Sequence, residues 1–207
     1  MDISQNNFPT VGEAKKLLLW GNKNNPGPWM DHSKVAARAA KTIAQKCNLN
    51  GNAAFILGLL HDIGRYEGVT GLHHIYAGYE LMTEKGYSYI AKICLTHSFP
   101  DKNLNSYIGK NDCTKEETIE IKNKLKDYEY DDYDRLIQLC DTIGSSDGIC
   151  FMEKRILDVI KRYGKVNKSI VKKWDTIFEI KKYFDKLCGI NIYNLFLEEI
   201  ICHQMKN

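Results

Sequence analysis

Proline is scarce in this chain of 207 residues, and its placement leaves most of the sequence free to form helices. The four prolines are at positions 9, 26, 28 and 100, so nothing after Pro100 imposes a break on a helix. Apolar residues recur at helical spacing, whereas the alternation that indicates strands is nowhere sustained. We therefore expect an all-α protein, a single helical-bundle domain with a C-terminal helical extension.

Periodicity, glycines and capping signals together give the approximate bounds of the helices. Asn50 is expected to cap one helix, and Thr114 with Glu117 forms a capping-box signature for another. Loops are expected at 21–28, 64–71 and 99–111. The predicted helices cover residues 11–20, 29–47, 53–61, 74–85, 87–97, 114–126, 133–143, 149–163, 169–187 and 191–204. We expect an N-terminal helix and loop over 1–27, the main domain over 28–163, and helices packing on it over 164–207.

The charge balance gives no strong sign of a nucleic-acid partner. Lysine and arginine number 29 against 26 acidic residues, for a net charge of +3. Basic residues gather late in the chain, as at Arg162 and Lys173, but their helical spacing favours a solvated face. Apolar residues make up 43% of the chain, which is ordinary for a globular domain.

The cysteines and the N-terminus predict a cytoplasmic protein. The seven cysteines form no Cys-x-x-Cys pair, and their odd number indicates a reducing context rather than a disulfide framework. The first residues lack the pattern of a signal peptide. No run approaches the ~18 apolar residues that a membrane span needs.

Four histidines and two aspartates fall on the apolar faces of the predicted helices: His32, His61, Asp62, His74, His97 and Asp141. One inward histidine is usually an ordinary core residue. Six unpaired polar groups would each cost about 1–3 kcal/mol, against a total stability of only ~5–15 kcal/mol. Coordination of a metal removes this cost. Imidazole and carboxylate ligands without thiolate suit iron, manganese or zinc in an open, catalytic site.

This order of residues resembles the HD superfamily of metal-dependent phosphohydrolases. The resemblance covers residues 28–163 and rests on His32, on Asp141 and on the stretch Gly58-Leu-Leu-His-Asp-Ile-Gly-Arg65. The elements His74-Ile-Tyr-Ala-Gly78 and Ile93-Cys-Leu-Thr-His97 resemble those of HD proteins that hold two metals. The whole series is similar to bacterial HD hydrolases of diadenosine tetraphosphate, and to a reduced version of the HD-GYP phosphodiesterases.

Three departures narrow this resemblance. Ser98 stands where the HD-GYP enzymes carry a second histidine. Arg65-Tyr66 stands where the ppGpp hydrolases carry an acidic pair, and Arg65 also replaces a glutamate that some HD nucleotidases use.

The resemblance implies a centre with one or two divalent ions of Fe, Mn, Zn, Co or Mg. The first ion would be bound by His32, His61, Asp62 and Asp141, and the second by His74 and His97 with Asp62 as a bridge. A metal-bridging hydroxide would then attack a phosphate ester or anhydride. Asp62 and Arg65 are the expected catalytic residues. The Arg65 guanidinium can bind phosphate through its forked donors. The alternative for Arg65 is a surface salt bridge. The expected partner is a phosphorylated small molecule of the nucleotide class.

Other interpretations stay open at this point. The chain could be a metal- and nucleotide-binding sensor without catalysis, a di-iron HD oxygenase, or a helical interaction module in which the inward residues form ion pairs. His73 is assigned to the surface or the substrate cleft, and Trp29 and Trp174 to core packing rather than base stacking. Ser98, Lys102 and the loop over 100–111 are candidates to border the substrate. Oligomeric state is open, with a homodimer among the options.

Overall fold

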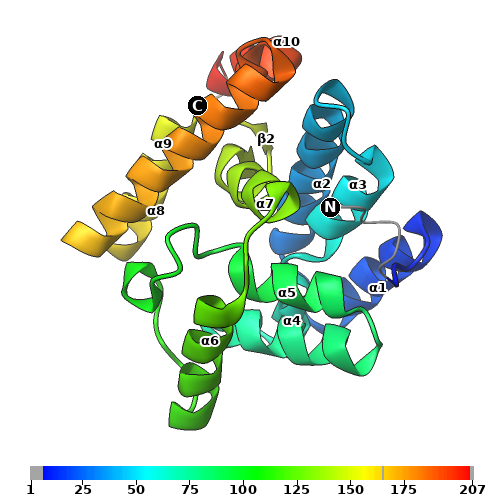
Figure 1. Ribbon diagram of the computed structural model, residues 1–207, viewed down its shortest axis with the longest axis vertical. Coiled ribbons are helices and arrows are strands. Elements are labelled where there is room, and N and C mark those ends of the chain that lie inside the picture. The colour runs from blue at the N-terminus through cyan, green and yellow to red at the C-terminus, as the bar shows by residue number, and fades with distance from the viewer. Residues whose placement is uncertain (1–6, 165, 206–207) are drawn as a thin grey trace.

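The fold is a bundle of helices, as the sequence predicted (Figure 1). The computed structural model describes residues 7–164 and 166–205. Within these residues the chain forms ten α-helices, short 3-10 turns and a single antiparallel hairpin of two-residue strands. The expected all-α class is therefore confirmed. None of the described helices is both long and apolar enough to cross a membrane.

The main core lies among the helices of the first two thirds of the chain and extends to buried residues between 177 and 200. α2 packs on α3 and on α7, while α4 packs on α5 and on the 3-10 turn η2. The bounds of these elements are α1 (Val11–Asn24), α2 (Trp29–Lys46), α3 (Gly51–Leu60), η2 (Ile63–Glu67), α4 (His73–Glu84), α5 (Ser88–Thr96) and α7 (Asp132–Ile143). A smaller apolar cluster, which includes Ile75, Phe99 and Leu125, joins α4 and α5 to α6 (Lys115–Asp127).

The rest of the chain adds a second group of elements to the bundle. After α7 come the hairpin strands β1 (Gly144–Ser145) and β2 (Gly148–Ile149), then α8 (Met152–Tyr163) and α9 (Lys168–Cys188). The chain ends with the turn η4 (Ile192–Phe196) and α10 (Leu197–Met205). α9 contacts α7 and also the turn η3 (Leu104–Ser106). In Figure 1, α10 and α6 lie at opposite ends of the long axis.

Two glycines allow the close contacts that bring the inward histidines together. A Cβ added at Gly58 would lie 2.5 Å from the Cα of Ala37, so α3 can touch α2 only without a side chain there. At Gly64 an added Cβ would lie 1.9 Å from the carbonyl oxygen of His74 and 2.4 Å from the amide nitrogen of Gly78. These contacts hold the ends of α3 and η2 against α2 and α4.

The bounds of several elements differ from those that the sequence predicted. Gly21 does not end the first helix, which continues to Asn24. A Cβ at Gly21 would lie 2.9 Å from Ile63 Cδ1, so this glycine serves packing inside the helix. Residues 144–149, partly assigned to a helix, form the hairpin, and α8 begins at Met152. The capping box of Thr114 and Glu117 is present, as predicted.

The cysteines also differ from the expectation. Cys47, which follows α2, forms a disulfide with Cys188 at the end of α9, across a sequence separation of 141 residues. The spacing of the cysteines, taken as a sign of free thiols, did not predict this bond. Of the other cysteines, Cys94, Cys140 and Cys150 are buried thiols.

Candidate metal centre

The six inward residues of the sequence analysis converge on one place, although they come from five segments of the chain. His32 is in the first turn of α2, His61 and Asp62 follow the last residue of α3, and His74 is the second residue of α4. His97 directly follows α5, and Asp141 is near the end of α7. The four histidines and Asp62 are at most 7% exposed, whereas the Asp141 side chain is 26% exposed.

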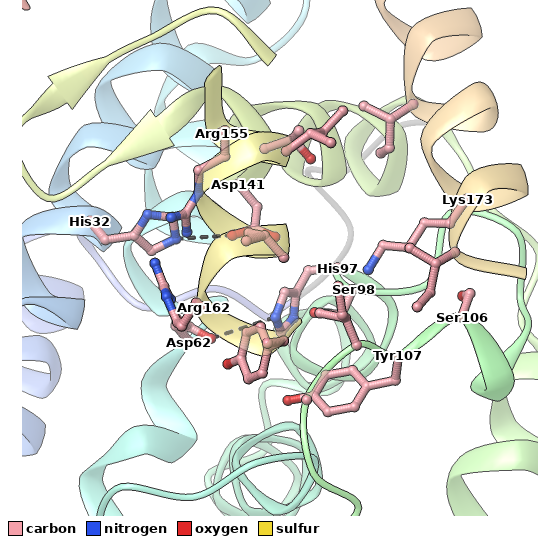
Figure 2. Close-up of a pocket in the computed structure, with 18 of the residues that line it drawn as sticks. His32, Asp62, His97, Ser98, Ser106, Tyr107, Asp141, Arg155, Arg162 and Lys173 are labelled. Carbon is pink, nitrogen blue, oxygen red and sulfur yellow. Dashed lines mark hydrogen bonds and ion pairs between the residues drawn. The ribbon is translucent and has the colours of Figure 1, made fainter. Parts of the chain in front are cut away.

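The first half of the centre is formed by His32, His61 and Asp141. The Nε2 atom of His32 lies 2.9 Å from Asp141 Oδ1 and 3.3 Å from the Nε2 atom of His61. His61 Nε2 is 3.6 Å from the same carboxylate oxygen. Three ligand-type atoms from α2, α3 and α7 thus face one another, and Figure 2 shows the contact of His32 with Asp141.

The second half is formed by Asp62, His74 and His97. Asp62 Oδ1 lies 3.1 Å from His74 Nε2 and 3.5 Å from His97 Nε2. Asp62 also belongs to the first half, because ligand atoms of His32, His61 and Asp62 lie within 4.8 Å of one another. The same limit holds for Asp62, His74 and His97. Asp62 is therefore the residue that the two halves share.

Backbone carbonyls fix the orientation of three imidazole rings. The Nδ1 atom of His61 donates to the carbonyl oxygen of Gly58 at 2.7 Å, and that of His97 to Cys94 at 2.8 Å. His74 Nδ1 donates to the carbonyl oxygen of Gly71. A carbonyl oxygen can only accept, so Nδ1 carries the proton, and in the neutral ring Nε2 presents a lone pair to the centre. Histidines that bind metals are held in this way.

Charges inside the centre keep both carboxylates ionised and one histidine neutral. Burial opposes the ionisation of Asp62, but Arg65 and His74 outweigh it and hold the pKa of this carboxyl well below its usual range. The pKa of Asp141 is also lowered, because the effects of His32 and His61 outweigh the effect of burial, which raises it. Burial lowers the pKa of His97 to about 3, so this ring is neutral and available as a ligand.

A cation fits the arrangement of these atoms. Asp62 Oδ1 is buried and has no hydrogen-bond partner within the described part of the chain, although two histidine Nε2 atoms face it. A buried acceptor without a partner costs free energy, and acceptors that face one another repel. A divalent cation between them removes both costs. Four imidazoles and two carboxylates are also a donor set that Zn, Mn and Fe accept.

Arg65 lies within the centre instead of at the surface. Its Nε atom donates to Asp62 Oδ2 at 2.6 Å, and its Nη2 atom is 3.4 Å from His74 Nε2. The side chain is 31% exposed and lines the pocket above the centre. The ion pair considered from the sequence therefore exists, but it orients a candidate metal ligand.

A cavity of about 320 Å³ opens above the centre, and its far walls carry positive charge. Arg155 and Arg162 of α8 and Lys173 of α9 line it, together with Tyr107 and Trp174. Figure 2 shows the Lys173 amine directed into the pocket from α9. Burial lowers the pKa of Lys173, while Asp141 and Asp101 oppose this effect.

These basic residues are the part of the site that sequence reasoning missed. Arg162 and Lys173 were assigned to a solvated helix face; Arg162 is indeed exposed, although it also borders the pocket, whereas Lys173 is partly buried and lines it. Of the residues expected to border the substrate, Ser98, Ser106 and Tyr107 line the pocket, whereas Lys102 does not. Trp29 is buried and Trp174 is partly buried, and both border the cavity. The side chain of His203, a residue that the sequence places far from the six inward residues and assigns to a structural or exposed position, lies outside the described part of the chain.

Comparison with known proteins gives one match. The family model of the HD domain matches residues 29–144, which include all six inward residues and Arg65 but neither α8 nor α9. No curated protein and no solved structure matches the chain.

Proposed function

Because the chain belongs to the HD-domain family, we propose that it is a metal-dependent phosphohydrolase acting on a phosphate ester or anhydride, of the nucleotide class. The observation that carries this proposal is the pair of three-residue ligand groups that share Asp62 at the floor of a basic pocket. Divalent cations bound there would supply an activated water and neutralise charge on the phosphoryl oxygens.

Different residues would bind the ions and the substrate. His32, His61 and Asp141 would bind one ion, His74 and His97 the other, and Asp62 both. Arg65 keeps Asp62 ionised and in one orientation through the 2.6 Å contact with Oδ2. Because part of the guanidinium is exposed to the pocket, its remaining donors would bind a non-bridging phosphate oxygen.

The pocket supports a substrate with more than one anionic group. The inner phosphate would lie on the centre and Arg65, whereas Arg155, Arg162 and Lys173 line the walls contributed by α8 and α9. Tyr107 and Trp174 offer aromatic surface for a base. Nucleoside polyphosphates combine these features. Dinucleoside polyphosphates such as diadenosine tetraphosphate are one candidate within that class, on the resemblance of the ligand series alone.

The proposal is tested with purified full-length protein that has been stripped of metal and reloaded with Mn, Fe, Co or Mg. Phosphate release is screened on nucleotides, dinucleoside polyphosphates and simple phosphate esters, and bound metal is counted in parallel. We expect turnover of a nucleotide in the wild type. Asp62→Asn should lower kcat by about 10³-fold or more, since it removes several kcal/mol of charge stabilisation.

Asp31→Asn is the matched control, because Asp31 is exposed on the same helix as His32 and, among the described residues, its one ion pair is with Lys34. It should retain both metal and activity. If the protein binds metal and nucleotide without turnover, the result would favour a non-catalytic sensor over an enzyme. Oxygen consumption by the iron form would indicate an oxygenase. Failure of the wild type to bind metal, with His61→Ala no different, would leave only an interaction module.

A further inference from the structure

Three ligand-type side chains meet at a second place, outside the centre. These are His73 at the start of α4, Cys113 in the loop that precedes α6, and Glu117 in the first turn of α6. One ligand atom from each lies within 4.8 Å of the other two. All three are partly buried, with the side chains of His73 and Glu117 26% and 20% exposed, so an ion can reach them from solvent.

The His73 ring is oriented as a metal ligand would be. Its Nε2 atom lies 2.8 Å from Glu67 Oε2, and the Tyr66 hydroxyl donates to the other oxygen of Glu67 at 2.8 Å. The opposite ring nitrogen, Nδ1, points to Glu117 Oε2 at 3.4 Å. A carboxylate that accepts from one ring nitrogen fixes the ring and leaves the other nitrogen for the ion.

Negative charge accumulates around this ring. Glu67, Asp112 and Glu117 all lie close to His73, and Asp112 accepts from the backbone amides of Gly71 and His73 at 2.6 and 2.9 Å. Within the part of the chain that the structure describes, neither Glu67 nor Glu117 forms an ion pair with a lysine or arginine. A cation at this place would be attracted by all three carboxylates.

We propose that His73 Nδ1, Cys113 Sγ and a Glu117 carboxylate oxygen bind a zinc-type divalent ion, separate from the ions of the centre. Nitrogen, sulfur and oxygen ligands of this kind are those of zinc sites, and a single thiolate separates this site chemically from the centre. Three protein ligands leave a fourth position for water. On binding, the Cys113 thiol releases its proton to solvent and the sulfur donates its electron pair to the ion.

Such an ion would join the wall of the pocket to the centre. His73 is bonded through the backbone to His74, and Cys113 follows the loop whose residues Tyr107–Gly109 line the pocket. The same junction already has backbone contacts, because Leu72 N donates to the carbonyl oxygen of Lys110 at 2.8 Å. Binding of the ion would therefore fix this loop relative to the second half of the centre.

Titration of the metal-free full chain with Co²⁺ tests the proposal directly. A thiolate on cobalt gives a charge-transfer absorption in the near ultraviolet, which the centre cannot produce because none of its six ligands is sulfur. We expect this band in the wild type. It should be lost in Cys113→Ser, with one bound cobalt fewer per chain, and weakened in Glu117→Gln, which keeps a side chain able to close the capping box of α6.

The control variants separate this site from the centre and from stray thiols. Cys202→Ser, at an exposed cysteine, should keep the band, and His61→Ala should keep it too. A wild type without the band would overturn the proposal, leaving a protonated His73 between two carboxylates. A band that survives Cys113→Ser would also overturn it. A band without phosphohydrolase activity would leave this site standing and remove only the proposed function.

Discussion

At Gly64 the fold depends on the absence of a single side chain. The residue lies two positions after Asp62, and its Cα faces the backbone of His74 and Gly78. Asp62 and His74, which lie on the two sides of this contact, are candidate ligands of the second half of the centre. The spacing between Asp62 Oδ1 and His74 Nε2, 3.1 Å, is therefore set by a backbone contact that any Cβ would disrupt.

We expect Gly64→Ala to destabilise the protein by about 1–3 kcal/mol, the usual cost of overpacking a close contact. Its added carbon would overlap a carbonyl oxygen and an amide nitrogen, neither of which is a flexible side chain. The free energy of unfolding, measured in urea, gives the size of the effect. Binding of metal should weaken in parallel, because His74 is displaced relative to Asp62.

Gly12→Ala is the control for this substitution. Within the described part of the chain, a Cβ at Gly12 would meet Thr10 Oγ1 alone, at 3.8 Å, and the residue lies in the first turn of α1. Alanine there should leave stability unchanged or raise it by up to ~1 kcal/mol, because glycine is a poor helix former. Equal losses in the two variants would contradict a specific role for Gly64.

At the scale of single residues, the sequence could predict which polar residues converge at the centre but not which residues form the pocket walls. His32, His74 and Asp141 were recognised because polar residues on an apolar helix face need a partner. Arg162 and Lys173 carry no such signal, since a basic residue on an amphipathic helix is normally solvated. Their position depends on how α8 and α9 lie over the centre, which is a property of tertiary packing.

At the scale of elements, local signals placed most helix bounds within one or two residues, and the larger errors fall at the end of α1 and at the starts of α8 and α10. Asn50 and Thr114 cap their helices through side-chain contacts with nearby amides, which the sequence shows directly. Gly21 was misread as a stop because its packing against Ile63 involves a distant segment. The hairpin at 144–149 was missed, since two-residue strands are too short for alternation to appear.

α9 presents two adjacent lysines in different environments, and this pair allows a test of the pocket. Lys173 is partly buried and lines the cavity, whereas Lys172 is exposed. We expect Lys173→Met to raise KM for the phosphorylated substrate by about 10–100-fold, corresponding to the ~1.5–3 kcal/mol of a hydrogen bond to a charged group. Steady-state kinetics with the metal-loaded protein provide the measurement.

Lys172→Met removes the same charge one residue away and should leave KM nearly unchanged. The metal content of both variants should equal that of the wild type, because neither lysine is a candidate ligand. A tenfold change of KM in both variants would indicate a long-range effect of the positive charge instead of a contact with the substrate. An unchanged KM in Lys173→Met would show that the amine does not touch the substrate.

At the scale of the whole molecule, the centre joins elements that are otherwise held mainly by apolar packing. Its candidate ligands come from α2, α7 and the ends of α3, α4 and α5, so bound ions would connect five segments of the main bundle. The disulfide between Cys47 and Cys188 ties α2 to α9 in addition. Stability should therefore respond strongly to metal.

We expect saturating metal, at about 100 times its dissociation constant, to stabilise the fold by ~2.7 kcal/mol and to raise Tm by roughly 5–11 °C for a chain of this size. Thermal unfolding with Mn²⁺ and with a chelator measures this shift. His61→Ala should show a much smaller one. An equal shift in this variant would mean that the stabilising ion binds elsewhere.

The family match ends at residue 144, at the start of the hairpin, whereas Arg155, Arg162 and Lys173 all follow it. The candidate metal centre and the charged pocket walls are thus encoded in consecutive, nearly separate stretches of the gene. Mutations in the second stretch can change which molecule is bound without touching a ligand of the first. A chimera that keeps residues 1–144 and exchanges the helices beyond them would be a direct way to alter selectivity.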